Sequence, residues 1–306
     1  MKKILIILIL FIFISLTFNG FTIKAISRDY DKYILKLDFI DEDNLPFNFR
    51  KTTDLKRLEN SNLDLVGLNK LNISGSAEFT KLSLEALKRN IDSDFPITVV
   101  DLRAEAHGFI NGNAINWIVT KEEIDENHEI SLEQVTEIEN KLLASIPLNK
   151  SISLLKTKND NKINLIPTLV ENEMNLTKST NLNYFRIPVI DNKRPTDDMV
   201  DRFIIFINDL PKDYWIHFHC DMGDGRTTTF MSMFDMMRNS NNIEFNNILK
   251  RQAMLGNINL DIFDEREPRL LFLKNFYQYT RDNKDNFKTL WSEWIKEKNI
   301  EPYPQK

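Results

Sequence analysis

The chain is short of the residues that build disulfides, metal sites and basic surfaces. Its 306 residues include one cysteine, Cys220, so no intramolecular disulfide can form. The four histidines are dispersed and no HExxH or CxxC spacing occurs, which excludes the common zinc motifs. The formal net charge of −5 does not suit nucleic acid or an anionic membrane. We therefore expect no metal or other cofactor, no nucleic acid partner and no stable membrane partner.

Glycine is also scarce, with 8 in the whole chain, yet Gly223 and Gly225 closely follow the cysteine. The apolar and aromatic run Trp215–His219 favours a buried strand, and Arg226–Arg238, without Gly or Pro, suits a helix. Cys220 therefore lies at a strand-to-helix turn. Backbone N–H groups at such a turn can surround an anion and lower the pKa of a thiol.

The segment from Cys220 to Arg226 is a Cys, five residues, Arg pattern that suits phosphoryl chemistry. A thiolate is a strong nucleophile, and the planar guanidinium of Arg226 can hold two oxygens of a phosphoryl group. Thr227 can donate a hydrogen bond to the thiolate, and His219 is expected to orient the loop. The residues expected to bind the phosphate through the loop are Asp221, Met222, Gly223, Asp224 and Gly225. The competing interpretation is that Cys220 is a small buried hydrophobic residue.

The run HCDMGDGRTTTF resembles the phosphate-binding loop of the protein-tyrosine-phosphatase-like phytases, within the cysteine-dependent phosphatase superfamily. Three further segments resemble that family in its order, and the match extends from about Asn48 to Tyr279. They are LNISGSAEF, DLRAEAHGFINGNAINW and RIPVIDNKRPTDDMVDRF. The resemblance implies an α/β fold with a central, mostly parallel sheet flanked by helices and a small partial β-barrel insert.

A phosphatase of this kind needs a general acid to protonate the leaving oxygen. Asp191 is our candidate, because it follows the strand-like run Tyr184–Ile190 and precedes a helix expected from Thr196 to Leu210. The alternative is that Asp191 only caps a turn. Asp197 and Asp198 compete for the role, but they suit the first turn of that helix, where the dipole favours carboxylates.

The segment from Asp191 to Pro195, which we call the acid loop, departs from the family pattern. The family usually has His and Trp where this chain has Asn192 and Arg194, so the contacts that close the loop are expected to differ.

The chemistry then predicts a metal-free, two-step hydrolysis through a phosphocysteine. The resemblance implies that the small-molecule substrate is an inositol polyphosphate such as phytate. The alternatives are a protein tyrosine or dual-specificity phosphatase acting as an exported effector, and a phosphoanion-binding module without catalysis. A polyphosphorylated substrate would require a basic rim around the site. Our candidates for it are Arg50, Lys156, Lys193, Arg194 and Lys274.

The first residues resemble a secretory signal peptide, with Lys2 and Lys3 before the apolar run Ile4–Ile14. We expect residues 1–25 to be this signal and the protein to be secreted or held in the periplasm or cell envelope. An uncleaved N-terminal anchor is the alternative. Residues 26–306 would form one phosphatase domain, with a small β-rich insert built from N-terminal strands and roughly residues 148–180.

Further elements can be expected from periodicity. Ile97–Arg103 predicts a core strand, and Ser131 with Gln134 predicts a capping box at the start of a helix. Other expected helices are Leu82–Asn90 and several after Glu244. The ionisable residues Asp101, Arg103, Glu105 and His107 alternate along one stretch, which favours a buried salt-bridge network. Trp291 and Trp294 have helical spacing and are expected to pack in the core.

Overall fold

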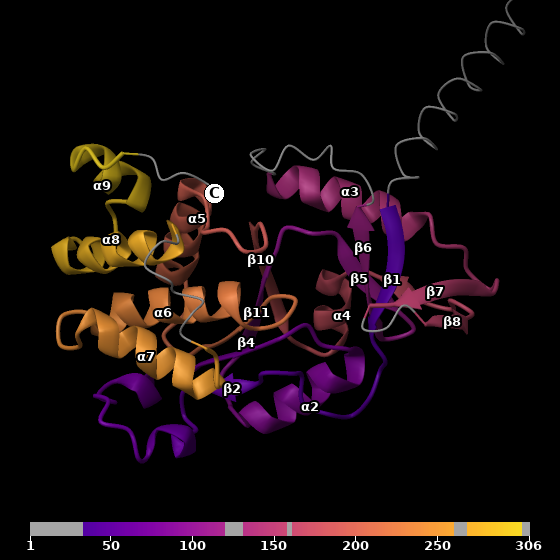
Figure 1. Ribbon diagram of the computed structural model, residues 1–306, viewed down its shortest axis with the longest axis horizontal. Helices are drawn as coiled ribbons and strands as arrows, with labels where there is room; N and C mark the ends of the chain where they lie inside the picture. Colours follow the sequence, from indigo (N-terminus) through magenta and orange to yellow (C-terminus); the bar gives the residue numbers. More distant parts are fainter. Residues whose placement is uncertain (1–32, 120–130, 158–160, 260–267, 302–306) are drawn as a thin grey trace, which may run out of the picture.

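The centre of the molecule is a five-stranded sheet, shown in the middle of Figure 1. The structure, a computed structural model, describes residues 33–119, 131–157, 161–259 and 268–301. The strands, in spatial order, are β10 (Asn183–Val189), β4 (Ile97–Arg103), β11 (Trp215–His219), β3 (Ile73–Ser76) and β2 (Arg50–Lys51). The first four are parallel and β2 is antiparallel to β3. The expected mostly parallel sheet is confirmed.

Strand β11 lies between two parallel neighbours, and all five of its residues are buried. A strand buried on both faces requires a continuous apolar or aromatic run, which is what its sequence supplies. His219 at its carboxyl end pairs with Ser76 of β3 and Asp101 of β4. The loop after β11 therefore leaves the sheet at the edge where parallel strands commonly place their ligand sites.

Helices cover both faces of this sheet, as expected for the fold class (Figure 1). One face is covered by α5 (Asp197–Asn208), α6 (Gly225–Asn239), α7 (Phe245–Gly256), α8 (Pro268–Asp282) and α9 (Trp291–Glu297). The other is covered by α2 (Lys81–Ile91) and α4 (Glu173–Ser179). Two short 3-10 turns, η1 (Lys56–Leu58) and η2 (Leu68–Lys70), lie between β2 and β3. Trp291 and Trp294 are buried in the first cluster, which confirms their expected packing role.

Helix α6 is buried along almost its whole length, from Arg226 to Met237. It follows β11 directly and packs against β3 and β11 on one side and α7 and α8 on the other. A helix buried on every side must be surrounded in this way, and its buried polar residues need partners, as Asp235 has in Arg251. Its N-terminus is consequently held in one position relative to the carboxyl end of β11.

A second sheet lies beside the central one, to the right in Figure 1. Its order is β8 (Lys162–Leu165), β7 (Ile152–Lys156), β1 (Tyr33–Phe39), β6 (Asn113–Val119), β5 (His107–Ile110) and β9 (Val170–Glu171). Helix α3 (Leu132–Ala144) packs against β5 and β9 and begins with the predicted capping box of Ser131 and Gln134. The strand pairings among the described residues run openly from β8 to β9. Closure into a partial barrel, and the division into domains, stay predictions.

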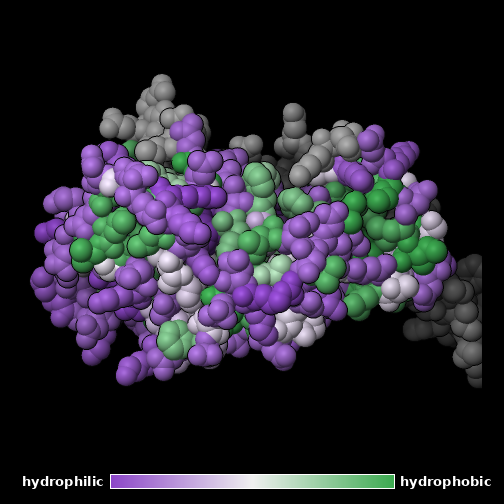
Figure 2. Space-filling view, turned by 90° about the horizontal axis from the view of Figure 1, so that it is seen from below, coloured by the Kyte–Doolittle hydropathy of each residue, from purple (hydrophilic) through white to green (hydrophobic). Residues whose placement is uncertain are grey.

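The surface in Figure 2 is mostly hydrophilic, with hydrophobic side chains in separate patches, as on an ordinary globular protein. Within the described ranges, no helix combines the length and the apolar character that a membrane crossing requires. The predicted signal peptide, residues 1–25, lies outside the described residues.

Candidate active site

Cys220 lies at the turn between β11 and α6, as the sequence predicts. Its side chain is 3% exposed, and the hydroxyl of Thr227 donates a hydrogen bond to Sγ over 3.2 Å. The same hydroxyl lies 3.4 Å from the carbonyl oxygen of Ser76 at the end of β3. Thr227 is therefore held beside the sulfur, in the position of a donor to a thiolate.

Glycine is required at one point of the phosphate loop, which we define as Cys220 to Arg226. Gly223 has φ +75°, and a Cβ there would lie 2.4 Å from the backbone nitrogen of Ala77. Only glycine fits this position, where the left-handed backbone and the close approach coincide. At Gly225 a Cβ would lie 2.9 Å from Nη1 of Arg269, so the end of that arginine side chain would have to shift to make room for one.

The first turn of α6 supplies donors for an anion. Among the described residues, no side chain caps helix α6 at its N-cap residue, Asp224. The amide of Thr228 bonds to the carbonyl of Asp224, so the N–H groups before it belong to the unpaired first turn. Asn48 holds the loop from outside, since its side-chain amide donates to Met222 O and to Oδ1 of Asp224. The loop is thus fixed with its amides free for a ligand.

The guanidinium of Arg226 is held end-on by Glu105. Nη1 and Nη2 donate to the two carboxylate oxygens over 2.7 and 2.9 Å, and Nη1 also donates to the carbonyl of Val189. Burial alone would lower the pKa of Arg226, but Glu105 and Cys220 raise it. Burial would likewise raise the pKa of Glu105, but Arg226 and Arg103 lower it. Nε of Arg226 is buried without a hydrogen-bond partner among the described residues, so the edge from Nε to Nη2 retains a donor for a ligand.

Asp191 lies next to this edge of Arg226, on the turn after β10. Its Oδ1 is 3.2 Å from Nη2 of Arg226, although its side chain is 64% exposed. Asn192 has φ +59° and donates its side-chain amide to Oδ2 of Asp191 over 3.1 Å. The structure therefore brings the predicted acid to the predicted phosphate site.

The competing carboxylates are engaged elsewhere. Oδ1 of Asp197 accepts hydrogen bonds from Arg194 and from the indole of Trp291, at 3.0 and 2.9 Å. Asp198 accepts one from Thr196 at the start of α5. Both belong to the first helical turn, as their sequence position suggests.

Arg50 and Arg194, which we expected to contribute to a basic rim, are both buried, and their contact with a substrate stays a prediction. Arg50 is 4% exposed and lies behind the loop, donating to Gly223 O and to the hydroxyl of Thr228. Arg194 is 5% exposed, pairs with Asp197 and lies over the ring of Phe272 in α8. Each is buried because a nearby acceptor or aromatic face compensates its charge. Both support the loops from inside the protein.

The lysines predicted for the rim lie on three different elements. Lys274 is exposed on α8, and Lys193 is half-buried in the acid loop. Lys156 is half-buried at the end of β7 in the second sheet. Their contact with a substrate stays a prediction.

Sequence reasoning missed Arg269, at the start of α8. Its guanidinium packs on Gly225 of the phosphate loop, and Nη2 donates to the carbonyl of Lys193 in the acid loop over 3.4 Å. A single buried side chain therefore touches both loops. Its sequence context, EREPRLLF, carries no signal for this role.

Sequence reasoning also missed Glu173, the first residue of α4. Its Oε1 accepts from Nε2 of His219 over 2.7 Å, and its Oε2 lies 3.0 Å from Nε2 of His107. The expected network of ionisable groups around it is confirmed: Arg186 pairs with Asp101, and Arg103 with Glu78 and Glu105. His219 is thus oriented from behind the loop.

His217 has the structural role expected of it. Its two ring nitrogens bond to the hydroxyls of Ser74 and Ser76, and burial lowers its pKa. His217 lies three positions before Cys220 in the sequence, and its two hydrogen bonds keep β11 attached to β3.

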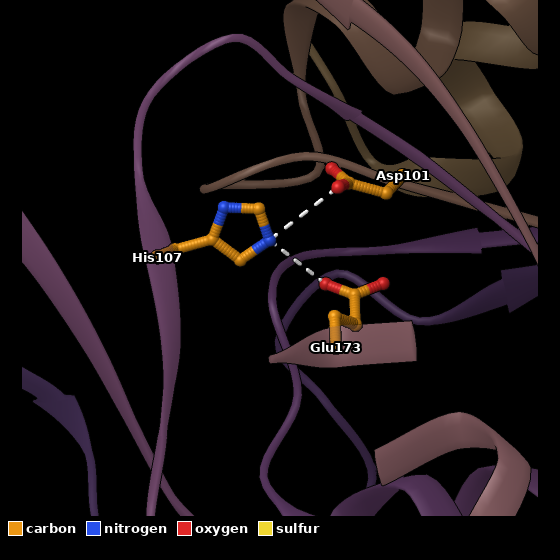
Figure 3. A group of neighbouring side chains, drawn as sticks. All are labelled: Asp101, His107 and Glu173. Carbon is orange, nitrogen blue, oxygen red and sulfur yellow. Dashed lines mark hydrogen bonds and ion pairs between the residues drawn. The ribbon is translucent and has the colours of Figure 1, made fainter. Parts of the chain in front are cut away.

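In the part of the chain that the structure describes, two clusters contain enough ligand atoms to be tested as cation sites. In the first, drawn in Figure 3, Asp101, His107 and Glu173 converge, but an Arg186 ion pair already compensates Asp101. The second consists of Asp38, Glu78 and Asp221, and Arg103 pairs with Glu78 over 2.5 Å. Burial raises the pKa of both Asp38 and Glu78, which favours their protonated forms. Protein cations and protons thus compensate these carboxylates.

Comparison with known proteins gives consistent results. The family model for PTP-like phytase, described as inositol hexakisphosphate, matches residues 100–238. The chain is similar to the PTP-like myo-inositol phosphatase of Mitsuokella multacida in complex with myo-inositol-(1,3,4,5)-tetrakisphosphate, with 30% identity and a TM-score of 0.80 over 90% of this chain and 49% of that one. It is similar to a PTP-like phytase from Bdellovibrio bacteriovorus, with 30% identity and a TM-score of 0.68 over 86% of this chain and 94% of that one.

A curated relative is the effector protein hopD2 of Pseudomonas syringae pv. tomato. It is 27% identical over 269 residues, which cover 80% of this chain and 56% of the relative. The chain therefore spans about half the length of the effector and of the Mitsuokella protein.

Proposed function

This chain belongs to the protein-tyrosine-phosphatase-like phytase family, and we propose on that premise that it hydrolyses inositol polyphosphates through a phosphocysteine intermediate. Cys220 is the nucleophile, Asp191 the general acid and base, and Arg226 with the loop amides the phosphate cradle. The substrate class is supported by the solved relative that holds an inositol tetrakisphosphate.

In the first step, the thiolate of Cys220 attacks phosphorus and an S–P bond forms as the P–O bond to the inositol breaks. Asp191 donates its proton to the departing oxygen, because an alkoxide is a poor leaving group at neutral pH. The Nε and Nη2 edge of Arg226 and the first amides of α6 hold the non-bridging oxygens, so the charge needs no metal ion.

In the second step, ionised Asp191 takes a proton from a water molecule, whose oxygen attacks phosphorus. The S–P bond breaks, and inorganic phosphate and the Cys220 thiolate are released. The hydroxyl of Thr227, 3.2 Å from Sγ, stabilises the negative sulfur as it departs.

One observation carries the proposal. The carboxylate of Asp191 lies 3.2 Å from Nη2 of Arg226, a nitrogen that also donates to Glu105. Acid, cradle and nucleophile are therefore assembled at one point, which a module that only binds phosphate would not need.

A phosphotyrosine phosphatase is the second candidate. Met222 in the phosphate loop is 45% exposed, and Phe47, which precedes the loop-binding Asn48, is 59% exposed. Apolar side chains beside a phosphate cradle suit an aromatic leaving group.

We also propose that the protein is exported, since its first residues have the pattern of a signal peptide and a relative is named as an effector. Mass measurement of the protein recovered from outside the cytoplasm would test cleavage after Ala25. Recovery of the full chain in the membrane fraction would instead support the anchor.

The decisive experiment measures phosphate release from phytate and from a phosphotyrosine peptide, each with an excess of chelator. We expect sustained release from phytate and at least about tenfold lower kcat/KM on the peptide. A preference for the peptide would establish the second candidate. Activity that collapses in chelator would contradict the metal-free cradle.

A further inference from the structure

One buried carboxylate, that of Glu173, contacts both His107 and His219. Glu173 is 1% exposed, and His107 and His219 are both fully buried. Figure 3 shows one oxygen of Glu173 directed at His107 and the other turned away from it. That second oxygen accepts from Nε2 of His219 over 2.7 Å. The carboxylate is therefore divided between two imidazoles.

The partners of His107 fix where its protons lie. Nδ1 is 3.0 Å from the backbone carbonyl of Glu105, which can only accept, and Nε2 is 3.0 Å from the carboxylate of Glu173. A hydrogen on each nitrogen satisfies both acceptors, which makes the ring an imidazolium, although Nη2 of Arg186, itself a donor, also lies 3.4 Å from Nδ1.

The charges around this ring support that state. Asp101 lies 3.4 Å from Nε2 and Glu139 3.5 Å from Nδ1, while Arg186 pairs with both of these carboxylates. Burial would lower the pKa of His107, but Asp101 and Glu139 raise it despite the opposing charge of Arg103. Burial would raise the pKa of Glu173, but His219 and His107 lower it, so this carboxylate is ionised.

The same chain of contacts reaches both ends of the phosphate loop. His219 immediately precedes Cys220, where the loop begins. His107 bonds to the carbonyl of Glu105, and the side chain of Glu105 holds Arg226, where the loop ends. We propose that Glu173 is a positioning residue that fixes both ends of the phosphate loop and thereby keeps the Cys220 thiolate stable. This inference rests on the proposed role of Cys220 as nucleophile.

A glutamine at this position would mismatch the two rings. Glu173 accepts from two Nε2–H donors, whereas a glutamine side chain has one acceptor and one NH2 group. In Glu173→Gln the NH2 group would face an Nε2–H, and one histidine would have to change its tautomer or turn away. The loop amides would then no longer converge on the sulfur, so the thiolate would lose part of its stabilisation.

The test is alkylation of Cys220 by iodoacetamide across pH, with no phosphorylated substrate. Cys220 is the only cysteine in the chain, so the rate reports this thiolate alone. In Glu173→Gln we expect the midpoint of the pH–rate profile to rise by about one unit and the rate below that midpoint to fall about tenfold. Glu171→Gln is the matched control, because it removes a carboxylate two residues away that bonds to neither histidine, and its profile should equal that of the original protein.

A folded Glu173→Gln protein with an unchanged pH–rate profile would overturn the proposal, whatever its melting temperature, because a merely structural role moves only stability. If this variant does not fold, 15N NMR of the histidines in the original protein decides. We expect His107 to be protonated on both nitrogens and His219 on Nε2 at neutral pH. An unprotonated Nε2 on either ring would refute the shared carboxylate. Neither measurement depends on the substrate, so failure here is distinct from failure of the proposed phytate hydrolysis.

Discussion

The phosphate loop and the acid loop meet at one guanidinium but are held very differently. Cys220 and Arg226 are 3% and 2% exposed, and Glu105, Thr227 and the packing of Gly223 fix the loop between them. Asp191 is 64% exposed at the side chain, and it contacts Arg226 and its neighbour Asn192. One loop is part of the core, and the other rests on it.

The difference suggests a division of labour between the two loops. Charge stabilisation requires hydrogen-bond donors that are already in place, because reorienting them during the reaction would cost free energy and reduce the stabilisation of the transition state. Protonation of the leaving group requires an acid that can let substrate enter and product leave. We therefore expect changes in the phosphate loop to affect every substrate, and changes in the acid loop to affect only substrates whose leaving group needs a proton.

The largest effect is expected for Cys220→Ser. Turnover should fall on the order of 10⁴-fold or more, because the hydroxyl is a far weaker nucleophile at neutral pH. Binding of inorganic phosphate, measured by calorimetry, should change less than about threefold, since Arg226 and the amides remain. Substantial residual turnover would exclude the phosphocysteine.

Asp191→Asn should separate the two loops. We expect phytate hydrolysis to fall about 10²-fold or more, whereas hydrolysis of p-nitrophenyl phosphate, whose leaving group needs no proton, should fall less than about fivefold. The ratio of kcat values on the two substrates measures the contrast. Equal losses on both would remove Asp191 from its role.

A smaller effect is expected for Arg194→Met, which removes the buried ion pair with Asp197 and the contact with Phe272. The acid loop should lose its position while the phosphate loop stays intact. We expect about a tenfold loss on phytate and little loss on p-nitrophenyl phosphate. Arg238→Met is the control, because Arg238 also lies over an aromatic ring, that of Phe234, but at the far end of α6. Similar losses in the two variants would indicate a general loss of stability.

The smallest effect concerns stability and pH. Burial alone would raise the pKa of Glu105, but the charges of Arg226 and Arg103 lower it below its ordinary value of 4.5. A lowered pKa in the folded state gives stability that is present above about pH 4.5 and lost as the pH falls. Between pH 5 and pH 3 the original protein should therefore lose about 2 kcal/mol more unfolding free energy than Glu105→Gln. Urea unfolding measures this, with the exposed Glu297→Gln on α9 as control. Identical pH dependence in Glu105→Gln and the original protein would show that this clamp contributes nothing.

The elements that the sequence predicted well are those with strong local signals. Strand Ile97–Arg103 is rich in β-branched residues, the helix after Cys220 is rich in Met and Phe and lacks Pro, and the capping box at Ser131 is a local pattern. The nucleophile and its arginine lie six positions apart, and one turn fixes their relation. The structure also brings Asp191 to Arg226, because parallel strands place their following loops at one edge.

The rest could not be predicted because it depends on tertiary pairing. Glu173 meets His219 across 46 residues, and Arg269 meets the acid loop across 76. Neither has a motif around it. Arg50 is a rim candidate from the family resemblance and Arg194 from its position beside Asp191, and the buried acceptors of both are not visible in the sequence. Glu105 did carry a signal, since it belongs to the alternating ionisable stretch that forms the buried network.

Strand β1 has a consequence for the order of folding. It begins at Tyr33, yet it lies in the interior of the second sheet, between β6 and β7, whose residues end at Val119 and Lys156. Among the described strands, β1 leaves a ribosome or an export channel first, and it must wait for about 80 later residues before β6 is complete and for more than 100 before β7 is. Such long-range pairing slows folding. A chain built in this way stays unfolded longer during synthesis, which is the state that passage through a narrow export channel requires.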